Sequence, residues 1–90
     1  MNSKKELKKA INSVCENLFL ECVAYTVYSK APAKENIDAI MTSILVMQMD
    51  YLCRISHPEP GMKAKEYYKK LKADFSKQAS EIIDQINNLE

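Results

Sequence analysis

The side chains with the most chemical potential in this 90-residue sequence are three cysteines and a single histidine. Cys53 and His57 are four positions apart, so on a helix they would share one face, as a nucleophilic thiol and its base must. Pro58 follows the histidine directly, and no third residue is placed to orient the imidazole. We therefore expect His57 to cap the end of a helix rather than to activate the thiol.

The other two cysteines do not form an evident redox or metal site. Cys15 and Cys22 are seven positions apart, about 10 Å along a helix, which is too far for a disulfide. The sequence contains no Cys-x-x-Cys, no Glu-x-x-His, and only one glycine, which excludes a glycine-rich phosphate loop. We expect three reduced thiols, no metal, no cofactor and no enzymatic activity, in a reducing compartment.

Length and composition are those of one small domain covering residues 1–90. Hydrophobic residues make up 47% of the chain and charged residues 28%, which is typical of globular proteins and not of disordered ones. One glycine and three prolines favour long helices joined by few turns. No secretory signal is recognisable, and no apolar run reaches the roughly 18–20 residues of a membrane span. We expect a soluble, cytoplasmic protein.

Two breaks divide the chain into three predicted helices, at residues 4–30, 34–56 and 60–88. The breaks contain the prolines, at Ala31-Pro32-Ala33 and at residues 56–61, where the only glycine also lies. Ser3 and Glu6 match a capping box at the start of the first helix. Because the connections are short, consecutive helices must be antiparallel neighbours. The predicted fold is all-α, an up-down-up antiparallel three-helix bundle.

Each predicted helix has an apolar face at three- and four-residue spacing. In the central helix, the most apolar of the three, the face consists of Ile37, Ile40, Met41, Ile44, Leu45, Met47, Tyr51, Leu52 and Ile55. In the first helix it consists of Leu7, Ile11, Val14, Leu18, Cys22 and Tyr25, flanked by Ala10, Cys15 and Tyr28. In the third it consists of Tyr68, Leu71, Phe75, Ala79, Ile82, Ile86 and Leu89.

The first two helices carry more apolar residues than one buried face needs. If antiparallel pairing brings together residues whose numbers sum to about 64, this surplus forms one exposed stripe along the hairpin. Exposed apolar stripes usually mark protein interfaces. The leading hypothesis is an interaction module that forms a homodimer, or binds another helical protein, through these two helices. The candidate interface consists of Phe19, Leu20, Val23, Val27, Val46, Met49 and Cys53.

Gln48 and the methionines of the central helix leave alternatives open. Gln48 projects into the apolar face, where its amide either bonds a backbone carbonyl, a tyrosine or water, or acts as a polar device that fixes register. Met41, Met47 and Met49 either fill the core or line an adaptable binding surface.

The charges are strongly polarised although the net charge is only +1. In the up-down-up topology one end collects ten lysine and arginine residues against four carboxylates, a net +6. The remainder carries three lysines against eight carboxylates, a net −5. The alternative function is therefore nucleic-acid or phosphate binding through the basic end, as opposed to a merely solvated lysine face. The candidate residues are Lys4, Lys5, Lys8, Lys63, Lys65, Lys69, Lys70 and Lys72.

Overall fold

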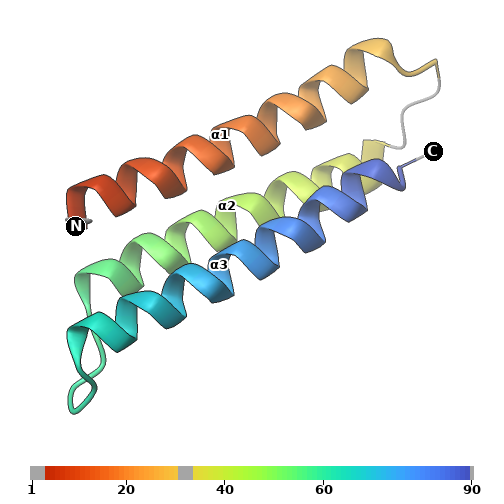
Figure 1. The fold of residues 1–90 in the computed structure, drawn as a ribbon. Helices are drawn as coiled ribbons and strands as arrows, with labels where there is room; N and C mark the ends of the chain where they lie inside the picture. Colours follow the sequence, from red (N-terminus) through yellow and green to blue (C-terminus); the bar gives the residue numbers. More distant parts are fainter. Residues whose placement is uncertain (1–3, 31–33, 90) are drawn as a thin grey trace.

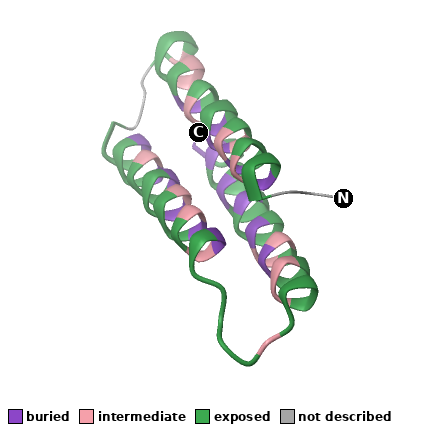
Figure 2. Cartoon of the chain, turned by 90° about the vertical axis from the view of Figure 1, so that its left-hand side faces the viewer, coloured by how far each residue is buried: buried purple, intermediate pink, exposed green. Residues whose placement is uncertain are grey.

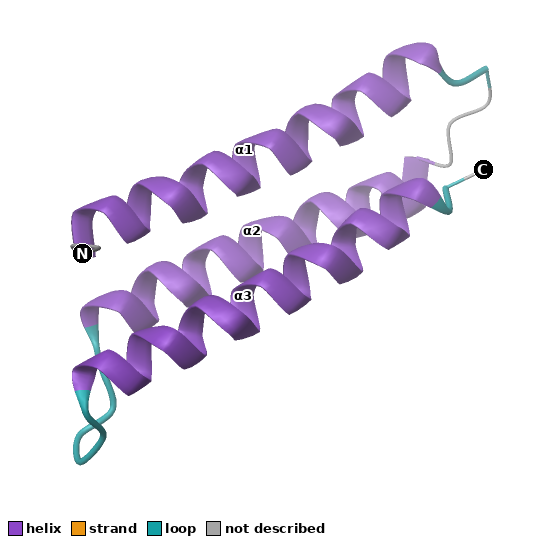
Figure 3. Cartoon of the chain, viewed as in Figure 1, coloured by secondary structure: helices purple, strands orange, loops and turns teal. Residues whose placement is uncertain are grey.

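Three long helices account for most of the computed structural model, which describes residues 4–30 and 34–89. They are α1 (Lys4–Tyr28), α2 (Lys34–Ser56) and α3 (Ala64–Asn87), and the described residues contain no strand (Figures 1 and 3). α2 runs back beside α1, and α3 returns beside α2. The beginning of α1, the end of α2 and the beginning of α3 consequently lie at one end (Figure 1). The predicted all-α, up-down-up three-helix bundle is confirmed.

Two of the helix boundaries differ from the predicted ones. α1 ends at Tyr28 instead of residue 30. α3 begins at Ala64 rather than near Pro60, because Gly61 has a φ of 87°, a left-handed conformation that cannot continue into a right-handed helix. A turn closed by the Met62 amide donating to the Glu59 carbonyl precedes the helix. The predicted cap at Ser3 and the break at residues 31–33 lie outside the described residues.

The core is a layer of aliphatic and aromatic side chains between the three helices (Figure 2). The predicted face of α3 is confirmed in full, with Tyr68 half-buried at its edge. Three other predictions are wrong, since Leu45 and Tyr28 are 49% and 84% exposed and Ala10 is also exposed. The buried residues are Leu7, Ile11, Cys15, Leu18, Cys22, Ile37, Ile40, Ile44, Met47, Tyr51, Ile55, Leu71, Phe75, Ala79, Ile82, Ile86 and Leu89.

The bundle is elongated, and its three helix pairs are not packed equally. It measures 50 × 19 × 16 Å, and its radius of gyration of 14.9 Å exceeds the roughly 12 Å of a compact chain of this length. α2 packs against both neighbours, whereas α1 and α3 have the fewest contacts with each other. α1 is therefore held mainly by α2, which matters for the surfaces described below.

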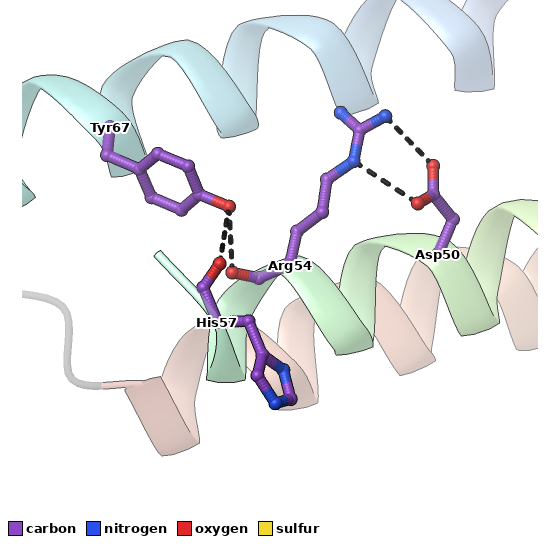
Figure 4. Close-up of polar contacts among 4 residues, drawn as sticks. All are labelled: Asp50, Arg54, His57 and Tyr67. Carbon is purple, nitrogen blue, oxygen red and sulfur yellow. Dashed lines mark hydrogen bonds and ion pairs between the residues drawn. The ribbon is translucent and has the colours of Figure 1, made fainter. Parts of the chain in front are cut away.

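Tyrosine hydroxyls close both ends of the bundle. At the far end the Tyr25 hydroxyl donates to the Leu89 carbonyl at 2.6 Å, which ties α1 to the second residue after α3. At the loop end the Tyr67 hydroxyl donates to the carbonyls of Arg54 (3.0 Å) and His57 (3.3 Å), shown in Figure 4. The Tyr68 hydroxyl donates to the Ile55 carbonyl at 2.9 Å. The bonds from Tyr67 and Tyr68 supply donors to carbonyls at the end of α2, where helical partners run out; the Arg54 carbonyl also accepts from the His57 amide at 3.3 Å.

Removing one of these hydroxyls should measurably weaken the bundle. Tyr67→Phe is expected to lower the free energy of unfolding by about 1 kcal/mol, because the Arg54 and His57 carbonyls lose the hydrogen bond from the Tyr67 hydroxyl. Chemical denaturation followed by circular dichroism measures this change. Tyr28→Phe is the control, since Tyr28 is 84% exposed and should leave stability unchanged.

Candidate interaction surfaces

The candidate interface residues predicted from the sequence are exposed, apart from Phe19. Leu20 and Val27 are 64% and 67% exposed, and Val23 is 47% exposed. On α2, Val46 and Met49 are 61% and 70% exposed, and Cys53 is also exposed. Phe19 is half-buried and packs against the core. The surplus of apolar residues in the first two helices thus lies largely at the surface.

The register of the α1–α2 pair differs from the predicted one. The Gln48 side-chain amide donates to the Asn12 side-chain oxygen at 2.8 Å, so level residues have numbers that sum to about 60, against about 64 in the prediction. Phe19 is therefore level with Met41, and the predicted proximity of Phe19 to Val46 is wrong. Gln48 is half-buried, and its partner is a side chain of the neighbouring helix. This interhelix bond agrees with the register-fixing alternative for Gln48.

Val46 does not belong to the surface shared by α1 and α2. It lies two residues before Gln48, and hence about 160° around the helix from the residue that bonds α1. It lines a groove of about 480 Å³ between α2 and α3, together with Gln78 and Glu81 of α3. Cys53 is about 140° from Gln48 by the same measure. The predicted single stripe is therefore wrong at Val46, which faces the α3 side.

Leu45 takes the place of Val46 beside α1. Around the axis of α2, Leu52, Leu45 and Met49 lie about 40°, 60° and 100° from Gln48, in the direction that leads away from the buried face. We call Leu45, Met49 and the half-buried Leu52 the α2 cluster.

On α1, three aliphatic residues occupy the corresponding outer side. Val23, Val27 and Leu20 lie within about 80° of Asn12, on the side away from the core. We call Leu20, Val23 and Val27 the α1 cluster. The α1 and α2 clusters thus share the outer face of the hairpin.

The two clusters lie at different heights on that face. In the observed register the α1 cluster is offset from the α2 cluster by about 12 residues, or about 18 Å along the helix axis. Asp38 and Lys34 of α2 lie across from the α1 cluster, near the end that holds the C-terminus (Figure 1). Lys5 and Lys9 of α1 lie across from the α2 cluster, near the basic end.

A third surface, which the sequence did not indicate, is the groove between α1 and α3. Two cavities of about 470 and 340 Å³ share Val14 and together run along both helices. Leu7, Ala10, Phe75 and Ile83 are among the residues that line them. The only sequence signals are the small side chain of Ala10 and the position of Ile83, 45% exposed, beside the apolar face of α3.

The basic end is present, but its lysines do not share one face. All the candidate lysines described are exposed except Lys8 and Lys72, which are half-buried. Lys72 lines the α1–α3 groove, whereas Lys70 lines a cavity with Arg54 and Asp74 on the α2 side. Lys4 to Lys9 belong to the first turns of α1. Lys70 and Lys72 therefore lie on different sides of α3.

The tyrosines between the lysines are occupied by contacts within the bundle. Tyr67 and Tyr68 pack edge to face, with ring centroids 5.3 Å apart, and both hydroxyls bond α2 carbonyls. Both rings are half-buried. They are therefore engaged by the protein itself and do not form an open platform on which bases could stack.

The Cys53–His57 pair is close, but its geometry is that of a helix end. His57 Nδ1 lies 3.1 Å from the Cys53 carbonyl oxygen and 3.8 Å from Cys53 Sγ. Because a carbonyl only accepts, the shorter contact is a hydrogen bond when Nδ1 carries the proton. This contact agrees with the expected capping role of His57, and the imidazole lies at the exposed end of α2 (Figure 4).

The remaining chemistry of the chain is sparse. Burial raises the pKa of the Cys15 and Cys22 thiols, with a further increase at Cys22 from the nearby Glu21 charge. Within residues 4–30 and 34–89, no three side chains of His, Cys, Asp or Glu are grouped so that they could hold a metal ion. None of the helices in the described part of the chain combines the length and hydropathy needed to cross a bilayer.

No family model, curated protein or solved structure matches this chain.

Proposed function

We propose that this protein is a non-catalytic helical module that self-associates through the outer face of the α1–α2 hairpin. The observation that carries the proposal is the exposure of five aliphatic or methionine side chains on this one side. They are Leu20, Val23, Val27, Leu45 and Met49, each 47–70% exposed. An apolar surface of this kind usually marks an interface.

The energetics favour this face over the α1–α3 groove. The large side chains that line the groove, such as Leu7, Leu18 and Leu71, are already buried by the bundle itself. In contrast, the five exposed side chains of the α1 and α2 clusters each keep about half to two-thirds of their surface in contact with water. Full burial of such a side chain is worth about 1.5–3 kcal/mol, so two copies together could gain on the order of 10 kcal/mol. That is enough to offset a typical cost of association.

A glutamate within the α1 cluster should abolish self-association. Val23→Glu would bury an unpaired carboxylate against a second copy, so we expect a dimer to become a monomer at low micromolar concentration. Light scattering on a sizing column measures the molar mass directly. A monomeric wild-type protein, or a Val23→Glu variant that stays dimeric, would contradict the proposal.

Val46→Glu is the matched control. Val46 has comparable exposure, 61%, but lies on the α3 side of α2. The same substitution there should leave the molar mass unchanged. This comparison separates the loss of a specific contact from a general effect of added charge.

Polyanion binding through the basic end stays a prediction, and no contact in the structure adds support to it. Its test is binding to mixed DNA and RNA at low salt, with affinity falling steeply as salt rises. Changing Lys65, Lys69 and Lys70 to glutamine should then reduce the salt dependence. The absence of catalytic activity also stays a prediction.

A further inference from the structure

The groove between α1 and α3 lies between the two helices that have the fewest contacts with each other. Its two cavities, of about 470 and 340 Å³, share Val14 and follow one another along the helix axes. Pockets for small molecules have volumes of roughly 300–1,000 Å³. The groove is therefore large enough for a small molecule, and its shape is elongated.

The inner wall of the groove is apolar. Leu7 and Phe75 line the first cavity, Leu18 and Ile86 line the second, and all four are buried. Because the bundle already buries these side chains, a protein partner that covered them would remove little further apolar surface from water. A flexible apolar chain gains instead by taking its own surface out of water. The groove therefore suits a hydrocarbon chain better than another helix.

Three lysines mark one end of this groove. Lys72 lines the first cavity, and Lys69 and Lys65 lie about one and two turns nearer the basic end of the bundle. At 100° per residue, all three lie within about 40° of Ile83, which lines the second cavity. The side of α3 that borders the groove thus carries lysines at one end and an apolar side chain further along.

The carboxylates of the groove do not cancel these lysines. Glu6 lines the first cavity from α1, so three lysines lie near one carboxylate there. None of the three lysines forms an ion pair with a described residue. The second cavity is bordered by Glu21 and by no lysine or arginine of the described chain. An anionic group is therefore favoured at the lysine end and disfavoured at the other.

The length of the groove sets the size of the chain that it accommodates. Lys72 and Ile86 are separated by about 21 Å along the axis of α3, at 1.5 Å per residue. An extended hydrocarbon chain advances about 1.25 Å per carbon, so about 16 carbons span this distance. The groove thus matches a molecule with one anionic head and one long apolar chain.

We propose that the α1–α3 groove binds one molecule of a free long-chain fatty acid. The carboxylate lies beside Lys65, Lys69 and Lys72, and the hydrocarbon chain follows the apolar wall from Phe75 to Ile86. This site does not depend on the proposed self-association, because that face lies on the α1–α2 side of the bundle.

Removing two of the lysines tests the position of the carboxylate. Palmitate binding is measured below its micelle concentration, by displacement of dansylated undecanoic acid and by titration calorimetry. Lys69→Gln combined with Lys72→Gln should raise the palmitate Kd by about 10-fold or more, because two charge-assisted contacts are lost. Lys70→Gln is the matched control, since Lys70 lines a cavity on the α2 side and its loss should leave the Kd unchanged.

Filling the groove tests the position of the hydrocarbon chain. Ala10 is exposed and lines the first cavity, so Ala10→Phe should occupy part of the groove and raise the palmitate Kd by about 10-fold or more. Ala39→Phe, at an exposed position of α2, is the control and should leave the Kd unchanged. Circular dichroism shows that each variant is folded. Laurate, which is four carbons shorter, should bind on the order of 100-fold more weakly than palmitate.

The outcomes separate a fatty-acid site from adsorption to the lysines. Saturable binding of one palmitate per chain, weakened by both groove variants and by neither control, supports the proposal. No palmitate binding, or equal weakening in the variants and their controls, would overturn it. Binding to vesicles of phosphatidylcholine and phosphatidylserine without binding of free palmitate would also overturn it, because the lysines would then contact a membrane surface instead.

Discussion

Replacing Tyr51 by alanine is expected to lower the free energy of unfolding by about 3–5 kcal/mol, the range for removing a buried aromatic ring. Tyr51 is the largest fully buried side chain in the described part of the protein. Its ring meets Phe75 edge to face, with centroids 5.3 Å apart, and the Arg54 guanidinium carbon lies 4.8 Å from the ring centroid. In a bundle of this size, stable by on the order of 5–10 kcal/mol, such a loss should leave a substantial unfolded population. Urea denaturation followed by circular dichroism measures it.

The hydroxyl of the same residue should have the opposite effect when it is removed. Tyr51 Oη is buried and has no hydrogen-bond partner among the described residues, and burial raises the pKa of this phenol. Tyr51→Phe keeps the ring and removes an unsatisfied polar group, so stability should rise by about 1 kcal/mol. A less stable phenylalanine variant would show that the hydroxyl has a partner, such as a buried water, and would contradict this expectation. The two substitutions together separate the ring from its hydroxyl.

Where one side of a helix is clearly apolar and the other sides are polar, the sequence was sufficient to predict which residues are buried. In α3 the predicted face agrees with the structure from Leu71 to Leu89, because lysines, carboxylates and amides fill the other sides. The breaks at proline and glycine likewise predicted the number and the order of the helices. The exception is the start of α3, where the left-handed Gly61 delays the helix beyond Pro60.

Where apolar residues surround a helix, periodicity could not decide which of them face solvent. Leu45 and Val46 are adjacent, about 100° apart, and both have apolar neighbours at helical spacing. Which side of α2 faces α1 depends on the direction in which the third helix packs, and the sequence pattern does not contain that direction. The register was also out of reach of periodicity, because the pairing that brings Asn12 to Gln48 differs from the predicted one by only a few residues.

The groove between α1 and α3 was missed for a related reason. Periodicity shows that residues such as Val14 and Phe75 belong to the core side, but it does not give the distance between two helices. That distance depends on how side chains of different size interdigitate along the whole pair. The cavities around Val14 result from this detail.

The three thiols should react at very different rates. Cys53 is exposed, whereas Cys15 and Cys22 have no exposed surface and their pKa values are raised by burial. A thiol reagent needs both access and the thiolate form. We expect one thiol per chain to react rapidly with an aromatic disulfide reagent, and the other two at least about 100-fold more slowly. Absorbance of the released thiolate measures both phases.

The slow phase would also report how α1 is held. Both buried thiols lie on α1, which has few contacts with α3, so the reagent should reach them when α1 separates from α2. Gln48→Ala removes the bond to Asn12 and should accelerate the slow phase by about fivefold, which corresponds to about 1 kcal/mol. Cys53→Ser should remove only the fast phase, and Tyr67→Phe, which loosens α3 from α2, should change the slow phase less than Gln48→Ala does. Rapid reaction of all three thiols in the native protein would mean that α1 is not stably packed, and the face proposed for self-association would then lack one of its two helices.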